Sequence, residues 1–407
     1  MSSRIPLWTV LRSREEFGDS ELPLLTVKSE SGIELRDLSQ GRQPSEDLSR
    51  YSIVRAGDLV VNRLWARFGA YGTSRFDGVI SPAYWVLSVD GRKIDPRYLH
   101  FLLRSEPFRQ EIGRRSKNMP PNGFEIPWDQ FKKIEIPSPP LEEQRRIADF
   151  LDGETSRIDS IAQRRRRMLK LLSERQSAFR DGLINSLADS VGELPLRRFI
   201  TRIEQGASPQ CHSVPRKTSS EWAVLKLSAV KAGVFNAAEN KLLPEDESPS
   251  LEFEVHAGDL LVTRANTPDL VGDVAVVPDE SHRLLLPDLI YRVGLMPHIS
   301  SEYVAQVALS RRVRSVVESI ARGSSQSMVK LRGEDIKVWP IPKADLAQQT
   351  KIVEMIAKGT AESSRLRIVI QRQLELFAER RQALITAAVT GQFDVTTASG
   401  RNTIQGV

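Results

Sequence analysis

The 407-residue sequence is poor in cysteine and has no long apolar runs. Its single cysteine, Cys211, cannot form a disulfide within the chain, and there is no Cys/His cluster of the kind that holds zinc. No run of about eighteen apolar residues is present to cross a membrane, and residues 1–17 lack the apolar core of a signal peptide. These absences favour a soluble protein of the reducing cytoplasm, without a membrane partner.

Motifs of common enzyme classes are also missing. The patterns GxGxxG, GxxxxGK[ST] and HExxH do not occur, nor does the NPPY-like run of DNA adenine methylases. What remains is a mild basic excess, 58 Lys and Arg against 52 Asp and Glu, which suits an anionic partner such as nucleic acid. We therefore expect no catalytic, cofactor-binding or metal site in this chain.

The sequence repeats itself over a long distance. AGDLVVNR at 56–63 returns as AGDLLVTR at 257–264, a displacement of 201 residues. From Pro82 onward the displacement becomes 205, so the four-residue difference lies between Arg63 and Pro82. Insertions are tolerated in surface loops, so each copy is expected to carry a loop of its own length and composition on a shared framework.

Each copy combines an α+β part with a long helical part. Runs such as GDLVV and YWVLSV predict strands, and helices are expected at 96–115 and 301–323. The long helical parts lack internal proline and repeat apolar residues at three- and four-residue steps, with Gly153 expected to interrupt the first. The predicted segments are an α+β domain at 1–140, a helical region at 141–192, a second α+β domain at 193–345, a second helical region at 346–395 and a flexible tail at 396–407.

Connectivity predicts how the long helices pair. The first enters the second domain and the second leaves it, and the ends of a domain commonly lie close together. The predicted fold is therefore α+β, with two pseudo-repeated α+β domains separated by an antiparallel coiled coil. At 1.5 Å per residue, some 30 to 45 helical residues span roughly 45 to 65 Å, comparable with one to two turns of B-DNA.

Three motifs resemble those of a known family. IPSPPLEEQRRIADFLD at 136–152, echoed by IPKADLAQQTKIVEMIA at 341–357, resembles the run that closes each target-recognition domain in specificity subunits of type I restriction-modification systems. GASPQ and EWAVLKLSAVKAGVFN, within 205–236, and the AGDL strands are similar to other parts of that family. The second copy departs from the closing motif at 343–345, and the first lacks a clear GxSP segment.

The resemblance implies a function, partners and cofactors. Each α+β domain would be a target-recognition domain that reads one half of a bipartite site in double-stranded DNA, and the coiled coil would fix the spacing. Methylation and cleavage would be done by two modification subunits and by restriction subunits in a cytoplasmic phage-defence system. S-adenosylmethionine, ATP and magnesium would belong to those partners, and this chain would be non-catalytic.

The candidate DNA-binding residues are polar side chains of the variable loops, of the stretch before NGFEIP in the first copy, and of the matching positions in the second copy. Arginine can reach guanine, Asn and Gln can reach adenine, and Lys and Ser more often grip phosphate. Taken singly, each is equally compatible with an ordinary solvated side chain. The candidates are Arg63, Arg67, Arg114, Arg115, Lys117 and Asn118 in the first domain, and Arg264, Asn266, Thr267, Arg322, Ser324, Ser325, Gln326 and Lys330 in the second.

Two other functions stay open on the sequence. PD at 287–288 with DIK at 335–337 matches a loose pattern of magnesium-dependent endonucleases. The two aspartates align with Ala83 and Gln130 of the first copy, which favours surface substitutions on a shared framework over a metal site. A third hypothesis is a scaffold of two adaptor domains on a coiled coil that does not bind DNA.

Overall fold

The computed structural model describes residues 3–18, 21–38, 47–118, 123–268, 270–278, 282–321 and 329–395. The chain divides into two compact units: unit 1 comprises Met1–Arg166 and Gln371–Val407, and unit 2 comprises Arg167–Ile370. Both long helices, α4 (Leu141–Val191) and α8 (Leu346–Val389), contribute residues to each unit. The predicted domain limits, in which the helical regions separate two α+β domains, remain a prediction.

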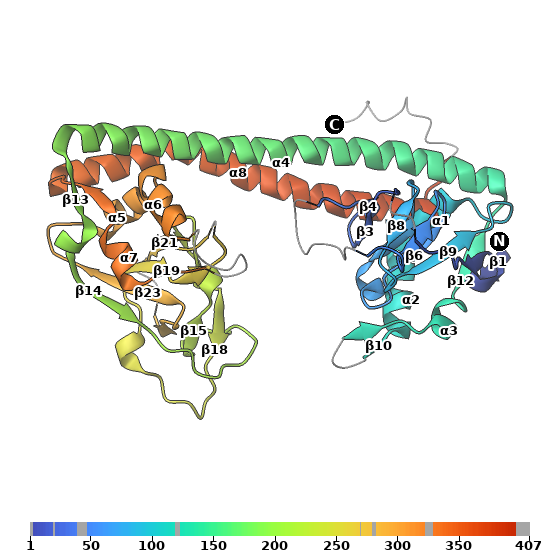
Figure 1. Cartoon of the computed structure of the whole chain (residues 1–407), viewed down its shortest axis with the longest axis horizontal. Coiled ribbons are helices and arrows are strands. Elements are labelled where there is room, and N and C mark those ends of the chain that lie inside the picture. The colour runs from blue at the N-terminus through green and yellow to red at the C-terminus, as the bar shows by residue number, and fades with distance from the viewer. Residues whose placement is uncertain are drawn as a thin grey trace. The chain divides into compact units, whose positions relative to one another are not determined.

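Unit 1 is built on a four-stranded antiparallel sheet with strands in the order β2-β9-β6-β7. Strands β6 and β9 of this sheet are labelled in Figure 1. The strands are β2 (Leu11–Ser13), β9 (Trp85–Val89), β6 (Leu59–Val61) and β7 (Tyr71–Thr73). Leu59 of β6 faces a core that includes Leu99 of helix α1 (Pro96–Arg104), whereas Val60 faces a second, smaller core. Alternate side chains of a strand point to opposite faces, so a sheet covered on both sides needs the uninterrupted apolar run that β6 supplies.

Unit 2 contains a sheet of the same order, β14-β23-β19-β21. Its strands are β14 (Ile200–Gln205), β23 (Ile290–Leu295), β19 (Leu260–Thr263) and β21 (Val274–Val276). Leu260 faces a core shared with Tyr303 of helix α5 (Ser301–Ala308), and Leu261 faces a separate core on the other side. The two units therefore share one framework, as the sequence repeat predicts.

Smaller elements complete each unit. In unit 1 the pairs β1-β12, β3-β4, β5-β8 and β10-β11 are formed by β1 (Ser3–Pro6), β12 (Glu135–Ser138), β3 (Leu25–Lys28), β4 (Gly32–Leu35), β5 (Ser52–Val54), β8 (Gly78–Ile80), β10 (Lys117–Asn118) and β11 (Phe124–Glu125). Its short helices are η1 (Leu7–Thr9), η2 (Ala66–Phe68), α2 (Glu106–Arg115) and α3 (Trp128–Phe131).

In unit 2 the smaller groups of strands are β13-β25, β18-β15-β22, β16-β17 and β20-β24. They consist of β13 (Glu193–Pro195), β25 (Pro340–Pro342), β18 (Asn240–Leu242), β15 (Ala223–Leu225), β22 (Leu284–Leu285), β16 (Val230–Lys231), β17 (Val234–Phe235), β20 (Ala265–Asn266) and β24 (Val329–Lys330). The remaining helices are η3 (Leu196–Arg198), η4 (Leu227–Ala229), η5 (Leu251–Phe253), α6 (Arg311–Ala321) and α7 (Gly333–Lys337).

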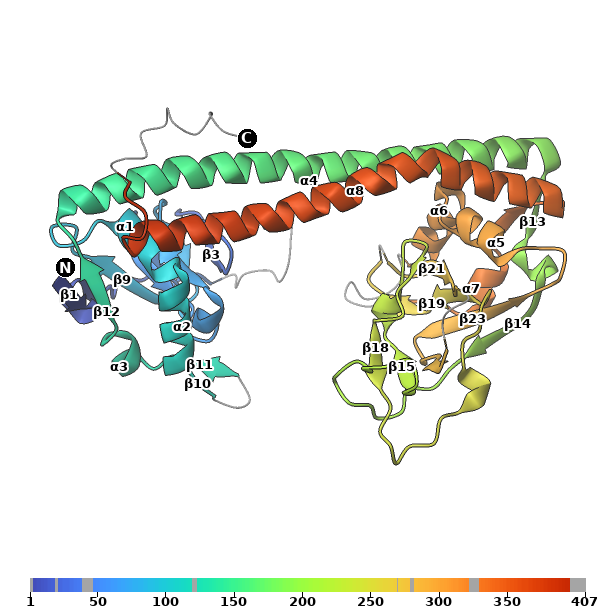
Figure 2. The same ribbon diagram turned by 180° about the vertical axis from the view of Figure 1, so that it is seen from behind.

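Helices α4 and α8 run antiparallel within each unit. Figure 2 shows the two helices as ribbons. In unit 1, Asp159 of α4 lies 3.2 Å from Arg381 of α8, and the ring of Phe150 lies 5.5 Å from that of Phe393, just beyond the end of α8. In unit 2 the amide of Gln176 donates to Ser364 at 3.2 Å, while three residues further along α4 the ring of Phe179 packs on Gly359. A Cβ at that glycine would collide with the ring, so glycine permits this close contact.

Two helix predictions are wrong in detail. The helix expected at 96–115 is split into α1 and α2, with Ser105 in an extended conformation between them. Pro107 lacks the N–H that a continuous helix would donate to the carbonyl of Leu103, and the hydroxyl of Tyr71 donates to that carbonyl at 2.9 Å instead. The helix expected at 301–323 is likewise divided, into α5 and α6, and residues 322 and 323 lie outside the described part of the chain.

The expected interruption at Gly153 is also wrong, because α4 continues through it from residue 141 to residue 191. Glycine in a helix interior costs about 1 kcal/mol relative to alanine. Buried neighbours Ala148, Leu151 and Thr155 on the same helix supply packing that offsets this cost. Tertiary contacts therefore override the local preference at this position.

One glutamine fastens each α+β part to the start of a long helix. Gln144 of α4 accepts a hydrogen bond from the backbone N–H of Asp95 at 2.8 Å and donates to the carbonyls of Pro139 at 2.8 Å and Lys93 at 3.3 Å. Gln349 of α8, 205 residues later, makes the equivalent three contacts. It accepts a hydrogen bond from the N–H of Ser300 at 2.9 Å and donates to the carbonyls of Ala344 at 2.9 Å and His298 at 3.0 Å. The repeated LEEQ and LAQQ sequences are thus explained by backbone groups that need the same partner in both units.

Candidate nucleic-acid interface

The repeated AGDL sequence forms a tight turn that leads into β6 and β19. Gly57 (φ +95°) and Gly258 (φ +82°) take a left-handed backbone conformation that favours glycine. The next residue, Asp58 or Asp259, accepts a hydrogen bond from the backbone N–H three positions earlier, at 2.8 Å in unit 1 and 2.9 Å in unit 2. The motif therefore fixes the start of two strands whose far ends carry the candidate arginines.

Arg63 and Arg264 occupy the same place in the two units. The carbonyl of Arg63 accepts a hydrogen bond from the N–H of Ile126 at 3.1 Å, and that of Arg264 accepts one from the N–H of Leu331 at 2.8 Å. Ile126 and Leu331 are themselves related by the 205-residue displacement. In unit 1 this bond brings the variable loop beside β11, which pairs with Lys117 and Asn118, and in unit 2 it brings the loop beside Lys330.

In unit 1 the meeting point is a group of exposed aromatic side chains around an arginine. Trp65, Phe68 and Phe124 are 57%, 47% and 39% exposed, and the rings of Trp65 and Phe68 lie 5.4 Å apart. The guanidinium of Arg67 lies 3.9 Å from the centre of the Phe124 ring, a cation–π contact. Arg67 makes no hydrogen bond to another residue in the described part of the chain.

Arg63 lies next to this group and pairs with an acidic residue. Its Nε atom is 3.2 Å from Oε1 of Glu125, and the two side chains are 46% and 26% exposed. Neither Phe124 nor Glu125 was among the predicted site residues. The sequence signal that could have identified them is the NGFEIP segment, which places an aromatic and an acidic residue where the second copy has Val329 and Lys330.

The other predicted residues of unit 1 differ in how many intramolecular contacts their side chains make. Arg114 and Arg115 both contact Glu111 at 2.6 Å, and Arg115 also donates to the carbonyl of Gln130 at 3.1 Å. Lys117 and Asn118 form β10, where both are exposed and pair with β11. The structure therefore brings Lys117 and Asn118 beside Phe124 and Glu125, while Arg115 is largely committed to intramolecular contacts.

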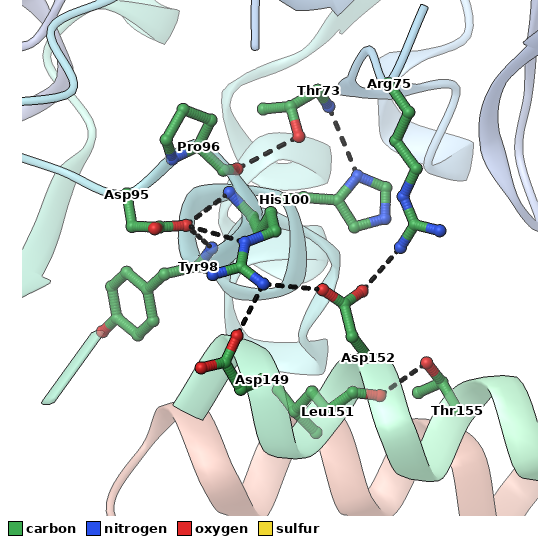
Figure 3. Close-up of polar contacts among 11 residues, drawn as sticks. Thr73, Arg75, Asp95, Pro96, Tyr98, His100, Asp149, Leu151, Asp152 and Thr155 are labelled. Atoms are coloured by element: carbon green, nitrogen blue, oxygen red, sulfur yellow. Dashed lines mark hydrogen bonds and ion pairs between the residues drawn. The ribbon is translucent and has the colours of Figure 1, made fainter. Parts of the chain in front are cut away.

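An ion-pair network ties the strand-and-loop part of unit 1 to α4 (Figure 3). Arg75, which follows β7, contacts Asp152 at 2.5 Å, and Arg97 of α1 contacts Asp149 at 2.6 Å and Asp152 at 3.3 Å. The hydrogen bond that Arg97 donates to Asp149 raises the pKa of Arg97. These contacts hold the end of the variable loop and the start of α1 against one face of the long helix.

A histidine lies behind the same network. The backbone N–H of Thr73 donates to Nδ1 of His100 at 3.3 Å, and the hydroxyl of Thr73 donates to the carbonyl of Pro96 at 3.1 Å (Figure 3). Desolvation, followed by the charge of Arg104, lowers the pKa of His100 well below its usual value. The imidazole is therefore a neutral acceptor, and its role is to support β7.

Arg104 supports the variable loop at Gly69 and Tyr71, close to Arg67 in the sequence. It is 6% exposed and donates to the carbonyls of Gly69 and Tyr71, both at 3.0 Å, as well as to those of Ser29 and Glu30. Burial lowers the pKa of Arg104 to about 10, so the guanidinium is still charged at neutral pH. The residues that follow Arg67, from Gly69 to Arg75, are thus held by contacts to helices α1 and α4.

In unit 2 the corresponding place has a different character. The Nη1 atom of Arg264 donates to the carbonyl of Asp288 at 3.3 Å, and its Nε is buried without a hydrogen-bond partner in the described part of the chain. Asn266 and Lys330 lie on the paired strands β20 and β24, and Oδ1 of Asn266 accepts from the N–H of Thr267 at 2.9 Å. Lys330 is exposed. The structure therefore gathers Arg264, Asn266, Thr267 and Lys330.

Four predicted residues of unit 2 lie outside the described part of the chain. They are Arg322, Ser324, Ser325 and Gln326.

The carboxylates of the nuclease hypothesis have structural roles. Asp335 accepts from the N–H of Arg332 at 2.7 Å and caps α7, while Asp288 accepts from the hydroxyl of Ser208. Lys337 contacts Glu334. Over the described residues there is no group of three or more His, Cys, Asp or Glu side chains placed to hold a metal ion, and no helix there is long and apolar enough to cross a bilayer.

The chain is similar to known specificity subunits. The family model for the type I restriction modification DNA specificity domain matches residues 63–169. The specificity subunit of the type I restriction enzyme EcoEI of Escherichia coli is 32% identical over 160 residues, 39% of this chain and 27% of that protein. The EcoKI specificity subunit of Escherichia coli strain K12 is 23% identical over 335 residues, 78% of this chain and 68% of that protein.

The chain thus matches only 27% of the length of the first relative and 68% of the second. A solved structure from work on complex assembly and conformational transition of the type I R-M system has a TM-score of 0.54 at 14% identity, covering 96% of this chain and 98% of that one, a likeness of fold alone. The matched domain and these two relatives make the chain similar to specificity subunits of type I restriction-modification systems.

Proposed function

We propose that the chain recognises a bipartite target in double-stranded DNA, with one half-site read by each α+β domain. The observation that supports this is a shared framework with different side chains at one position. The buried glutamines and the AGDL turns are the same in both units, whereas Arg63 lies with Glu125 and aromatic rings, and Arg264 lies in the region of Lys330. A shared framework that exposes different side chains in each domain suits the recognition of two different half-site sequences. The free energies by which the two domains discriminate between sequences then roughly add.

The chemistry of the exposed groups also favours nucleic acid over a protein partner. Arginine beside aromatic rings can contact base edges and phosphates, and Lys117 and Asn118 lie next to them. DNA-binding roles for the whole predicted set, including the residues outside the described part of the chain, belong to this proposal.

Assembly with other subunits is part of the same proposal. The chain would combine with two modification subunits and with restriction subunits in the cytoplasm, and those partners would use S-adenosylmethionine, ATP and magnesium. Helices α4 and α8 would set the distance between the half-sites. The chain itself would carry out neither methylation nor cleavage.

The test is a replacement of one domain. Residues 193–340 are exchanged for the matching segment of a relative with a different target, and the variant is expressed with its modification subunits. Sequencing of methylated motifs should show one half of the motif changed and the other half retained. A change in both halves would contradict the proposal that each domain recognises its own half-site.

A salt series separates the remaining hypotheses. DNA binding through phosphate contacts should weaken steeply as salt rises, whereas an adaptor scaffold would show no such binding. The purified chain should leave duplex DNA intact in magnesium. Cleavage that disappears in Asp288→Ala would favour the nuclease hypothesis instead.

A further inference from the structure

At one equivalent position the two units carry opposite charges. Glu125 precedes Ile126 and Lys330 precedes Leu331, the two residues whose N–H groups bond to the carbonyls of the paired arginines. Both side chains therefore belong to the strand that lies beside the end of β6 or β19. Among the residues that the structure describes, only unit 1 combines an arginine with a carboxylate there, with Arg63 Nε and Glu125 Oε1 3.2 Å apart.

The contact through Nε determines which part of the guanidinium is available. A carboxylate at Nε leaves the two Nη groups on the other side of the planar fork, and that end can donate to two acceptors at once. Glu125 is 26% exposed and carries unused lone pairs. The pair thus offers two donors next to an acceptor on a surface where both side chains reach solvent.

We propose that Arg63 and Glu125 together read one G·C base pair. The inference rests on the proposed function of DNA recognition and adds a specificity-determining residue to it. In the major groove guanine presents the acceptors O6 and N7, to which arginine donates bidentately, and its paired cytosine presents an N4 amino group, which Glu can accept from. The arginine therefore reads the guanine, and the glutamate reads the cytosine of the same pair.

Charge argues against a simple phosphate contact at this place. A carboxylate 3.2 Å from the arginine would repel a phosphate group, while it would attract an amino group on a base edge. Arg67, on the ring of Phe124, has no acidic partner among the described residues and is better placed for phosphate. In unit 2, Lys330 supplies a donor in place of the acceptor, so the second half-site should not be read through cytosine N4 at the equivalent position.

The experiment measures binding to a panel of duplexes. The full chain, assembled with its modification subunits, is titrated against its methylated-motif sequence and against duplexes that each carry one substituted base pair. The wild type should lose about 5- to 150-fold in affinity when the G·C pair read by Arg63 and Glu125 is substituted. Glu125→Gln should lose most of that discrimination at one pair and keep the others within about twofold. Arg63→Lys, which removes the planar fork, should affect the same pair.

Asp129→Asn is the matched control. It removes one negative charge from an exposed acid of the same unit, 73% exposed and paired with Lys132, without touching Arg63. Its binding profile should follow that of the wild type within about twofold across the panel. Circular dichroism and melting curves check that each variant is folded, and if Glu125→Gln is unfolded, Arg63→Lys decides.

Three results would overturn the pairing: an unchanged profile for Glu125→Gln, an equal loss for every duplex, or different base pairs affected by the two variants. An equal loss would assign Glu125 a role in folding or phosphate affinity. A wild-type complex that discriminates between no duplexes would instead refute the proposed function itself. The two failures are therefore distinguishable.

Discussion

Replacement of Gln144 by alanine should loosen unit 1 at the junction between α1 and α4. The side chain is fully buried and bonds to three backbone groups, at 2.8, 2.8 and 3.3 Å. Gln144→Ala leaves one N–H and two carbonyls without this partner. The bond to Pro139 is buried and the other two are partly buried, and an unsatisfied buried group costs about 1 to 3 kcal/mol. The 3.3 Å bond is weak, so we expect a total loss of about 2 to 4 kcal/mol.

The assay is native-state hydrogen exchange, because a chain of two units need not unfold in one step. Peptides that cover α1 should exchange roughly 30- to 700-fold faster in Gln144→Ala, which is the free-energy range above expressed as a ratio. Gln349→Ala should have the same effect on peptides that cover α5, because Gln349 makes the equivalent contacts. Each substitution should act on the unit that contains it.

Gln163→Ala supplies the control, since this residue is an exposed glutamine of the same helix. The chemical change is identical, and an exposed substitution usually alters stability by no more than about 0.5 kcal/mol. Equal exchange rates in Gln144→Ala and Gln163→Ala would refute the reasoning, because the buried backbone groups would then have found other partners at no cost.

Two further predictions concern pH and helix length. His100 has a pKa lowered by desolvation, so its protonation favours the unfolded chain, and stability should fall by about 1.4 kcal/mol between pH 7.5 and 5.5 as pH drops through the unfolded value of 6.5. Urea titrations should show a smaller fall in His100→Gln, and an identical pH dependence would contradict the assignment. If α4 and α8 set the spacing, one heptad inserted after Met168 and after Gln373 should lengthen the spacer by at most about three base pairs and leave both half-sites unchanged. Methylation profiling would test this, and an active variant with an unchanged spacer would refute it.

The framework was predictable because its signals are local. The AGDL turn needs a glycine and an aspartate at adjacent positions, and the long helices show their apolar spacing directly in the sequence. The division of the helix at 96–115 was also within reach, since Pro107 cannot supply the N–H that a continuous helix requires. Gly153 was the opposite case: a local preference pointed to a break, and packing of α4 against other parts of unit 1 outweighed it.

The candidate site was harder because its members meet through long-range contacts. Arg63 and Glu125 are far apart in the sequence and become neighbours when Ile126 donates to the carbonyl of Arg63. The two clusters of basic residues were found from the repeat, but nothing in the local sequence links a particular arginine to a particular acid. Phe124 was missed for the same reason, since its partner Arg67 lies on the other side of that contact.

This difference between local and long-range features has a thermodynamic counterpart. Loss of Gln144 is expected to cost several kcal/mol, whereas a partly exposed ion pair such as Arg63–Glu125 contributes about 0 to 1 kcal/mol to stability. A substitution at Glu125 can therefore change the side chains that this surface exposes while the unit stays folded. A substitution at Gln144 destabilises the framework that positions those side chains. The two copies can therefore share one framework and differ at the positions proposed to contact DNA, because those positions contribute little to the stability of the framework.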